Sequence, residues 1–365
     1  MTINTSHAII NSNSNNMEEI QDGTVSLVVT SPPYPMIEMW DELFISQNPA
    51  IKTELEQGKG QNAFDLMHKC LDDIWEEVDR VLIDSGFVCI NIGDATRTLN
   101  KDFCMYSNHS RIIKKFVEMG YSVLPDIIWR KTTNAPNKFM GSGMLPSGAY
   151  VTYEHEYILI FRKGGKRTFK KDEIPKRQES AFFWEERNVW FSDIWNLKGV
   201  SQKMIKASSE RERSAAFPFE LAYRLINMYS MKDDIVLDPF LGTGTTTLAA
   251  MASRRNSIGV EIDKSLVEST LNSLLYVEDN LNKRIIKRYT DHIDFINQEI
   301  ERGKDKWYEN PHLNSKVKTR QEKNIKFETI KSIELSDFKI QVKYQDLDPL
   351  QQIPQSDYSL FSYTK

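Results

Sequence analysis

The sequence contains few cysteines and lacks the long apolar runs of membrane proteins. Its three cysteines, Cys70, Cys89 and Cys104, lie in unrelated contexts without CxxC spacing. This indicates a reducing compartment and argues against a zinc site. No run of about 18 apolar residues is present, so no transmembrane helix is expected. The N-terminal stretch MTINTSHAIINSNSNN has no basic region followed by an apolar one, which argues against secretion and favours a cytoplasmic protein.

An overall excess of positive charge is also absent, since the net charge is −4. The charge is unevenly distributed: residues 1–100 carry 5 Lys/Arg against 16 Asp/Glu, whereas residues 101–365 carry 42 against 35. Much of the basic excess lies in Arg162–Lys171. A charge run is usually a solvated surface, but a basic stretch with interleaved aromatics also suits phosphate binding. Overall acidity does not exclude nucleic acid as a partner, because salt screening makes the local field decisive.

The remaining composition is that of a globular protein, with 40% hydrophobic and 11% aromatic residues. Short apolar runs alternate with segments of helical spacing. The expected strands cover residues 7–10, 27–30, 86–94, 121–129, 157–161, 234–238 and 257–261. The expected helices cover residues 64–83, 110–119, 217–229 and 247–253. This alternation predicts a layered α/β fold with a largely parallel sheet, in which residues 121–129 and 157–161 pair as a hairpin at the edge.

Three stretches do not follow this alternation. Pro35–Lys59 is polar and irregular, and we expect a mobile loop over a site. Residues 168–206 are rich in charge and tryptophan without a helix or strand period, which indicates an inserted module. Residues 276–365 are basic in patches and favour a helical pair followed by short strands, with packing as their simplest role.

A rigid turn follows the apolar run Leu27–Thr30. Pro32 and Pro33 lack an N–H group and fix φ near −65°, and each also restricts the residue before it. The turn therefore presents carbonyl acceptors and the Ser31 hydroxyl, with the aromatic ring of Tyr34 beside them. This arrangement suits a planar ligand whose exocyclic amino group donates hydrogens and whose face requires stacking.

A glycine-rich turn follows the second apolar run, Asp234–Asp238. Gly242 and Gly244 form a Gly-x-Gly turn that opens a helix, and such glycines allow a ligand to approach the backbone closely. A second strand ends at Glu261, which lies 19 residues after Gly242 and is placed to accept hydrogen bonds from ribose hydroxyls.

Together these motifs resemble those of the amino-methylating DNA methyltransferases. Thr30-Ser31-Pro32-Pro33-Tyr34 resembles that family's catalytic motif, and Asp238-Pro239-Phe240-Leu241-Gly242-Thr243-Gly244 resembles its S-adenosylmethionine motif. Tyr153–Lys163 is similar to the edge strand before the recognition region. Because the catalytic motif precedes the cofactor motif, the order resembles the permuted β group. The serine at position 31 resembles the cytosine-N4 branch.

The resemblance implies a doubly wound, permuted S-adenosylmethionine-dependent methyltransferase fold that acts on a flipped cytosine in double-stranded DNA without a metal. The implied catalytic residues are Ser31, Pro32, Pro33 and Tyr34. The implied cofactor-binding residues are Phe217, Pro218, Asp238, Pro239, Phe240, Gly242, Thr243, Gly244, Thr245, Thr246 and Glu261. The basic stretch supplies the expected DNA-binding residues Lys166, Arg167, Lys170 and Lys171. Two departures from the family pattern, Asn11-Ser12-Asn13 and Arg213-Ser214, lie near cofactor contacts.

The expected organisation has four parts. They are a catalytic half at 1–163, a target-recognition insert at 164–213, a cofactor-binding half at 214–275 and a C-terminal extension at 276–365. The resemblance implies a cytoplasmic enzyme of a bacterial or archaeal cell, a monomer or homodimer without a membrane partner. It also implies protection of host DNA from a separate cognate restriction endonuclease.

Three alternatives remain open at this point. An adenine-N6 methyltransferase has the same layout. A nicotinamide-dependent dehydrogenase explains Gly242, Gly244 and Glu261 but leaves Ser31 and Tyr34 without a role. A DNA-binding regulator without catalysis explains the basic insert but not the cofactor motif.

Overall fold

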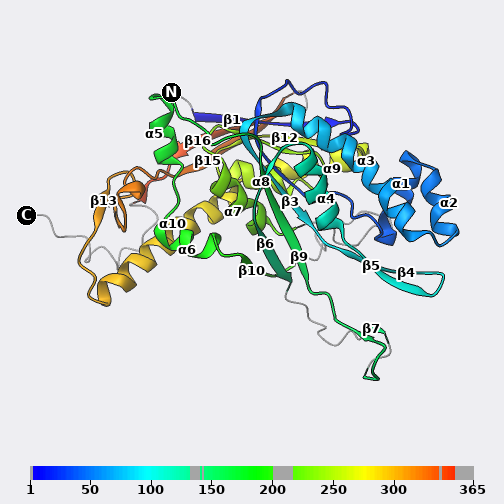
Figure 1. Ribbon diagram of the computed structural model, residues 1–365. Coiled ribbons are helices and arrows are strands. Elements are labelled where there is room, and N and C mark those ends of the chain that lie inside the picture. The colour runs from blue at the N-terminus through cyan, green and yellow to red at the C-terminus, as the bar shows by residue number, and fades with distance from the viewer. Residues whose placement is uncertain (1–2, 132–139, 142–143, 200–216, 337–338, 350–365) are drawn as a thin grey trace, which may run out of the picture. The chain divides into compact units, whose positions relative to one another are not determined.

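The computed structural model describes residues 3–131, 140–141, 144–199, 217–336 and 339–349 (Figure 1). The chain folds into two compact units. The first unit comprises Met1–Asn11, Lys166–Phe191 and Tyr223–Lys365, and the second comprises Ser12–Gly165 and Ser192–Ala222. Part of the expected recognition insert, residues 200–213, lies outside the described residues.

Five of the described strands in the second unit pair side by side. Their order is β10 (Ile194–Leu197), β6 (Ser122–Lys131), β9 (His155–Arg162), β3 (Leu82–Ile92) and β2 (Val25–Thr30). β2 runs parallel to β3, whereas β9 runs antiparallel to both β3 and β6. All six residues of β2 are buried, which fits a continuous run of apolar and β-branched residues. The expected pairing of β6 with β9 is confirmed, and the two strands run side by side in Figure 1. The expected edge position is wrong, because β10 pairs with the outer side of β6.

Helices of the second unit follow apolar periodicity. α3 (Gly60–Val81) buries a stripe that recurs every three or four residues, at Ala63, Phe64, Met67, Leu71, Ile74, Trp75 and Val78. In α4 (Asn108–Glu118), Phe116 stacks on Phe161 of β9 with ring centroids 4.2 Å apart. Two short antiparallel ribbons complete the unit, β4 (Ala95–Leu99) with β5 (Asp102–Tyr106) and β7 (Met140–Gly141) with β8 (Ala149–Tyr150).

The structure contradicts the loop expected at Pro35–Lys59 and adds detail to the stretch at 168–206. The expected loop at Pro35–Lys59 contains η1 (Glu38–Trp40), α1 (Asp41–Gln47) and α2 (Ala50–Glu56), and α2 packs on α3. Phe44 and Ile51 are buried, so a few apolar anchors suffice to hold these short helices. The stretch at 168–206 contains α5 (Glu173–Glu179), α6 (Trp184–Trp190) and β10, which extends the sheet by pairing in parallel with β6.

Five of the described strands in the first unit also pair side by side. Their order is β11 (Ile235–Asp238), β12 (Asn256–Glu261), β1 (Ile3–Asn11), β16 (Lys339–Asp346) and β15 (Glu328–Ser336). β11, β12 and β1 are parallel, whereas β16 is antiparallel to both β1 and β15. In sequence, the boundary between the two units falls after Ala222, within α7 (Phe219–Tyr229). The α-helices that follow are α8 (Thr245–Ala252), α9 (Lys264–Leu274) and α10 (Glu278–Glu301). The predicted layered α/β fold is confirmed in both units.

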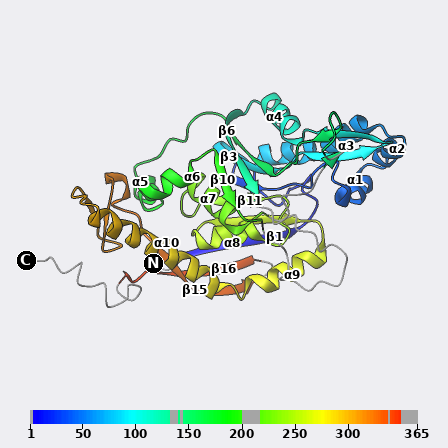
Figure 2. The same cartoon turned by 90° about the horizontal axis from the view of Figure 1, so that it is seen from below.

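The C-terminal extension is an integral part of the first unit. In place of the expected helical pair, the described part of the extension contains one long α-helix, α10, which packs along β15 in Figure 2. The β13 (Tyr308–Asn310) and β14 (Ser315–Val317) ribbon and η2 (Arg320–Glu322) follow it. The hairpin β15–β16 then completes the sheet beside β1. Since the strand at the N-terminus pairs with a strand of the extension, the extension belongs to the core of this unit.

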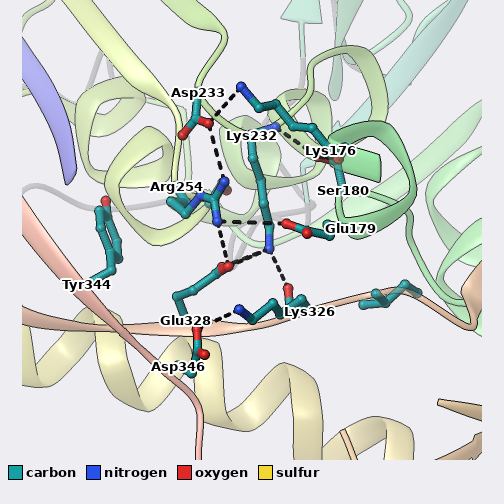
Figure 3. A network of polar contacts seen from close by, with 12 residues as sticks. Lys176, Glu179, Ser180, Lys232, Asp233, Arg254, Lys326, Glu328, Tyr344 and Asp346 are labelled. Carbon is teal, nitrogen blue, oxygen red and sulfur yellow. Dashed lines mark hydrogen bonds and ion pairs between the residues drawn. The ribbon is translucent and has the colours of Figure 1, made fainter. Parts of the chain in front are cut away.

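A buried ion network fixes the extension to the segment before β11 and the segment before β12 (Figure 3). Glu328 is 2% exposed, and its two oxygens lie 2.7 Å from Lys232 Nζ and 2.6 Å from Arg254 Nη1. Lys232 also donates to the carbonyl of Lys326 at 2.6 Å. Burial lowers the pKa of Lys232 to about 8, although the charge of Glu328 opposes this shift. Two buried cations therefore share one carboxylate of the extension, and Arg254 also lies 3.3 Å from Asp233.

Candidate active site

The turn after β2 forms a directed chain of hydrogen bonds in the second unit. Ser31 Oγ donates to the Tyr34 hydroxyl at 3.2 Å, and this hydroxyl donates to Glu156 Oε2 at 2.9 Å. A carboxylate accepts but does not donate, so the hydrogen of Tyr34 points to Glu156 and its oxygen receives the hydrogen of Ser31. As a result the lone pairs of Ser31 Oγ remain available to accept a hydrogen from a ligand.

Residues from two further strands hold this chain in place. Asn91, at the end of β3, donates through Nδ2 to the Tyr34 hydroxyl at 2.8 Å and to Glu156 Oε2 at 2.7 Å. Lys131, the last residue of β6, forms an ion pair with Glu156 Oε1. Burial raises the pKa of Tyr34 well above its ordinary value, and the charge of Glu156 raises it further. The phenol therefore keeps its proton and acts as a donor.

Gly93 allows the Tyr34 ring to sit close to the backbone. A Cβ atom at this position would lie 3.0 Å from Tyr34 Cε2 and 3.2 Å from Glu156 Cγ, so a larger residue would displace the ring. Asn108 adds support by donating to the carbonyls of Pro35 at 3.1 Å and Gly93 at 2.9 Å. The predicted turn is thus fixed on both sides, and the buried Pro32 and Pro33 lie within it.

Sequence reasoning missed Asn91, Lys131 and Glu156 as members of this site. A signal existed for Asn91, because it ends a strand parallel to β2, and the carboxyl ends of parallel strands meet at one edge of a sheet. Asp94 also follows β3, but its carboxylate accepts from the backbone N–H of His109 at 3.1 Å and lies 2.8 Å from the ring nitrogen Nδ1. Lys131 carries the same signal, because it ends β6, which runs in the same direction as β3. No local signal marked Glu156, which lies near the start of the antiparallel strand β9.

The glycine-rich turn in the first unit is held from inside by Asp238. The buried Asp238 carboxylate accepts from the backbone N–H of Phe240 at 3.1 Å and from Thr246 Oγ1 at 2.7 Å. Gly242 and Gly244 have φ values of +53° and +80°, in the left-handed region that favours glycine. A Cβ atom on Gly242 would meet only the Phe240 carbonyl, at 3.9 Å, so open space borders the backbone there. Asp238 therefore shapes the turn, while Gly242 offers room for a ligand.

Glu261 connects the end of β12 to this turn. Its Oε2 accepts from the backbone N–H of Gly242 at 3.0 Å and its Oε1 accepts from that of Asp263 at 2.9 Å. Each carboxylate oxygen has a second lone pair, and the side chain is half-buried, so it can still accept from a ribose. Asn11, one of the departures from the family pattern, donates to the Glu261 carbonyl at 2.8 Å. These features fit a nucleoside ligand.

The remaining residues expected to bind the cofactor differ in burial. Thr243 and Thr245 are half-buried near the same turn, and Pro239 is buried. Phe217 and Pro218 are buried and belong to the second unit. Within the described ranges, no helix is long and apolar enough to cross a membrane, and no group of three or more His, Cys, Asp and Glu side chains could hold a metal ion.

The four expected DNA-binding residues of the basic stretch differ in exposure. Lys166, Lys170 and Lys171 are exposed, whereas Arg167 is half-buried. Arg167 binds both carboxylate oxygens of Asp234, at 2.7 and 3.1 Å, and lies 3.6 Å from Glu173. Its guanidinium is therefore engaged within the first unit.

Comparison with known proteins identifies the class. Residues 25–272 match the family N6_N4_Mtase, described as DNA methylase, and the chain belongs to this family. It is 52% identical to the type II methyltransferase M.MthZI of Methanothermobacter thermautotrophicus over 94% of this chain and 97% of that protein. It is also 52% identical to the type II methyltransferase M.MjaI of Methanocaldococcus jannaschii over 72% of this chain and 89% of that protein.

A solved structure confirms the predicted fold. TTHA0409, a putative DNA modification methylase from Thermus thermophilus, was crystallised with S-adenosylmethionine and matches with a TM-score of 0.56. The sequences are 27% identical, and the match covers 76% of this chain and 95% of that one. The predicted DNA amino-methyltransferase family is thereby confirmed, whereas the dehydrogenase and the non-catalytic regulator are not supported.

Proposed function

We propose that this protein transfers a methyl group from S-adenosylmethionine to the exocyclic N4 of a cytosine flipped out of duplex DNA. The observation that carries this proposal is the directed chain Ser31–Tyr34–Glu156, which leaves a serine oxygen free to accept a hydrogen. A base inside a duplex cannot reach a cofactor, so the target must leave the stack.

The nitrogen of a cytosine amino group is a poor nucleophile, because its lone pair is delocalised into the ring. Ser31 Oγ and the Pro32 carbonyl would accept its two hydrogens and shift the lone pair toward the methyl donor. The Tyr34 ring would stack on the base, which is worth ~1–3 kcal/mol, comparable with the few kcal/mol that unstacking costs. Positioning of nitrogen and methyl in line would supply much of the remaining rate gain.

The first unit would hold the cofactor at the glycine-rich turn. Bound S-adenosylmethionine supplies the methyl group on an electrophilic sulfonium. Glu261 would accept from its ribose, and the open space at Gly242 would admit it to the backbone. Phe217 and Pro218 would hold its methionine part, as the family resemblance implies. The predicted set from Asp238 to Thr246 shapes the turn, with Asp238 as its internal support.

The choice of cytosine over adenine rests on Ser31 in the first position of the catalytic motif. The family name covers both N6 and N4 methylation, and an adenine-N6 methyltransferase is the alternative. The test is mass spectrometry of nucleosides from DNA of a methylation-free host that expresses the protein. We expect N4-methylcytosine. N6-methyladenine in its place would assign the protein to the other branch.

Recognition of a DNA sequence is assigned to the insert 164–213, between a catalytic half at 1–163 and a cofactor-binding half at 214–275. Lys166, Lys170 and Lys171 would contact phosphates, which give position but no sequence information. Replacing the insert with that of a relative should change the methylated sequence while S-adenosylmethionine affinity stays constant. If the folded chimera still modified the original sequence, specificity would lie in residues 134–150 or in the extension.

The names of the relatives, which are type II methyltransferases, support a proposal for the biological role. We propose that methylation by this protein protects host DNA from a cognate restriction endonuclease that acts separately. Genomic DNA of an expressing host should resist one sequence-specific endonuclease that cuts DNA of the parent strain.

A further inference from the structure

We infer that Ser31, Tyr34 and Glu156 form a proton relay, which carries a proton from the methylated amino group to the Glu156 carboxylate. This inference rests on the proposed function and adds an acceptor for the proton that the reaction releases. Glu156 acts through Tyr34 and Ser31 and does not itself contact the base.

The chemistry requires such an acceptor. The amino lone pair forms the new N–C bond, while the S–C bond breaks and its electron pair stays on sulfur. The nitrogen then carries a positive charge and must lose one of its two hydrogens as a proton. A serine hydroxyl is a weak base, so Ser31 can take this proton only if it passes its own proton on.

The geometry provides the path in the required direction. The hydroxyl hydrogen of Ser31 points to Tyr34 across 3.2 Å, and that of Tyr34 points to Glu156 across 2.9 Å. Each group can therefore receive a proton on its oxygen as it gives up its own. The raised pKa of Tyr34, caused by burial and by the charge of Glu156, disfavours a phenolate, so Tyr34 would transmit a proton without storing negative charge.

The two carboxylate oxygens of Glu156 have different partners. Oε2 accepts from Tyr34 and Asn91, whereas Oε1 faces Lys131. The Lys131 side chain is 40% exposed, which connects the buried end of the relay to solvent. Asp94, the other buried carboxylate near the turn, is engaged by His109 and by Tyr153 at 3.3 Å instead.

The test uses two variants that keep the shape of the site. Glu156→Gln retains an oxygen that can accept from Tyr34 but removes the carboxylate, and Tyr34→Phe retains the ring but removes the hydroxyl. Single-turnover methyl transfer is measured with tritiated S-adenosylmethionine and unmodified bacterial genomic DNA. Glu154→Gln is the matched control, because Glu154 lies two residues away and faces Arg130 at 3.9 Å.

We expect each variant to lower the single-turnover rate about 10²-fold or more, with little change in KM for DNA. The double variant should be no slower than either single one, because both break the same path. The control should keep the wild-type rate. A wild-type rate for Tyr34→Phe would overturn the relay, as would full activity of Glu156→Gln beside an inactive Glu156→Ala, which would show a purely positional role. A wild type that labelled no DNA would refute the methyltransferase function itself.

Discussion

Tyr34 and Glu156 are 122 residues apart in sequence, yet the phenol hydroxyl donates to the carboxylate at 2.9 Å. This bond connects the turn after β2 to the beginning of β9. It gives the hydrogen bonds of the rigid proline turn a defined direction, from Ser31 through Tyr34 to Glu156. Variants at this site, at the glycine-rich turn and in the buried ion network should therefore have separable effects.

Replacing Ser31 with alanine should abolish most methyl transfer while cofactor binding stays intact. The variant loses the hydroxyl acceptor in the second unit but leaves Asp238, Gly242 and Glu261 in the first unit unchanged. We expect a rate loss of about 10²-fold or more, with unchanged S-adenosylmethionine affinity by titration calorimetry. Wild-type turnover of the folded variant would remove Ser31 from the mechanism.

Replacing Glu261 with glutamine should weaken S-adenosylmethionine binding roughly 10- to 100-fold, since a hydrogen bond to a charged group is worth about 1.5–3 kcal/mol. Glutamine is preferable to alanine because Glu261 also accepts from the Gly242 N–H group. Gly242→Val should weaken binding as well, because a β-branched residue is strained at a φ of +53°. Calorimetry with the exposed Glu268→Gln variant as a control tests both. Unchanged affinity in the two folded variants would count against this pocket.

Replacing Lys166, Lys170 and Lys171 with glutamine should weaken binding to all duplexes alike. The slope of log K against log salt concentration should fall by about one for each lost phosphate contact. Arg167→Gln should behave differently and lower folding stability by about 1–3 kcal/mol, because it breaks the ion pair with Asp234. Fluorescence anisotropy at several salt concentrations, together with urea unfolding, distinguishes the two effects. An unchanged salt slope in the triple variant would contradict phosphate binding by these lysines.

Replacing Glu328 with alanine should destabilise the protein by about 3–5 kcal/mol, because the buried Lys232 and Arg254 lose their shared carboxylate. Glu334→Ala is the control on the same strand, since Glu334 pairs with Lys343 at an exposed site and should change stability far less. Urea unfolding measures both changes. Equal effects of the two substitutions would show that the buried network stabilises the fold no more than an exposed ion pair does.

Stability should fall as pH drops below about 6.5, the ordinary histidine pKa. Burial lowers the pKa of His7 and His68 to about 3. Between these values the unfolded chain binds protons that the folded chain excludes, so acidification favours unfolding. Each histidine should lower the free energy of unfolding by about 2 kcal/mol as the pH falls from about 7 to about 5. His7→Gln should reduce this pH dependence by about half, as measured by urea unfolding at pH values from about 7 to about 5. An unchanged pH dependence in the folded variant would contradict the role of His7.

Much of the site could be predicted because its motifs are local. The stiffness of Ser31–Tyr34 arises from two adjacent prolines, and the freedom of Gly242 and Gly244 arises from their missing side chains. The helix α3 could likewise be predicted, because its buried residues recur at helical spacing. In each case the physical cause lies within a few residues of its effect, so the sequence by itself determined these elements and the α/β class.

The tertiary structure alone decided which residues surround the catalytic turn. Asn91, Lys131 and Glu156 meet because β3, β6 and β9 pair in a particular register, in which Trp129 lies opposite Glu156 and Asn91 opposite Ile158. A shift of one residue would turn these side chains to the other face of the sheet. The four-residue strand β10 and the pairing of β16 with β1 also depend on partners distant in sequence. Neither register nor partner is encoded by neighbouring residues, which is why the relay acceptor and the place of the extension emerge only in the folded chain.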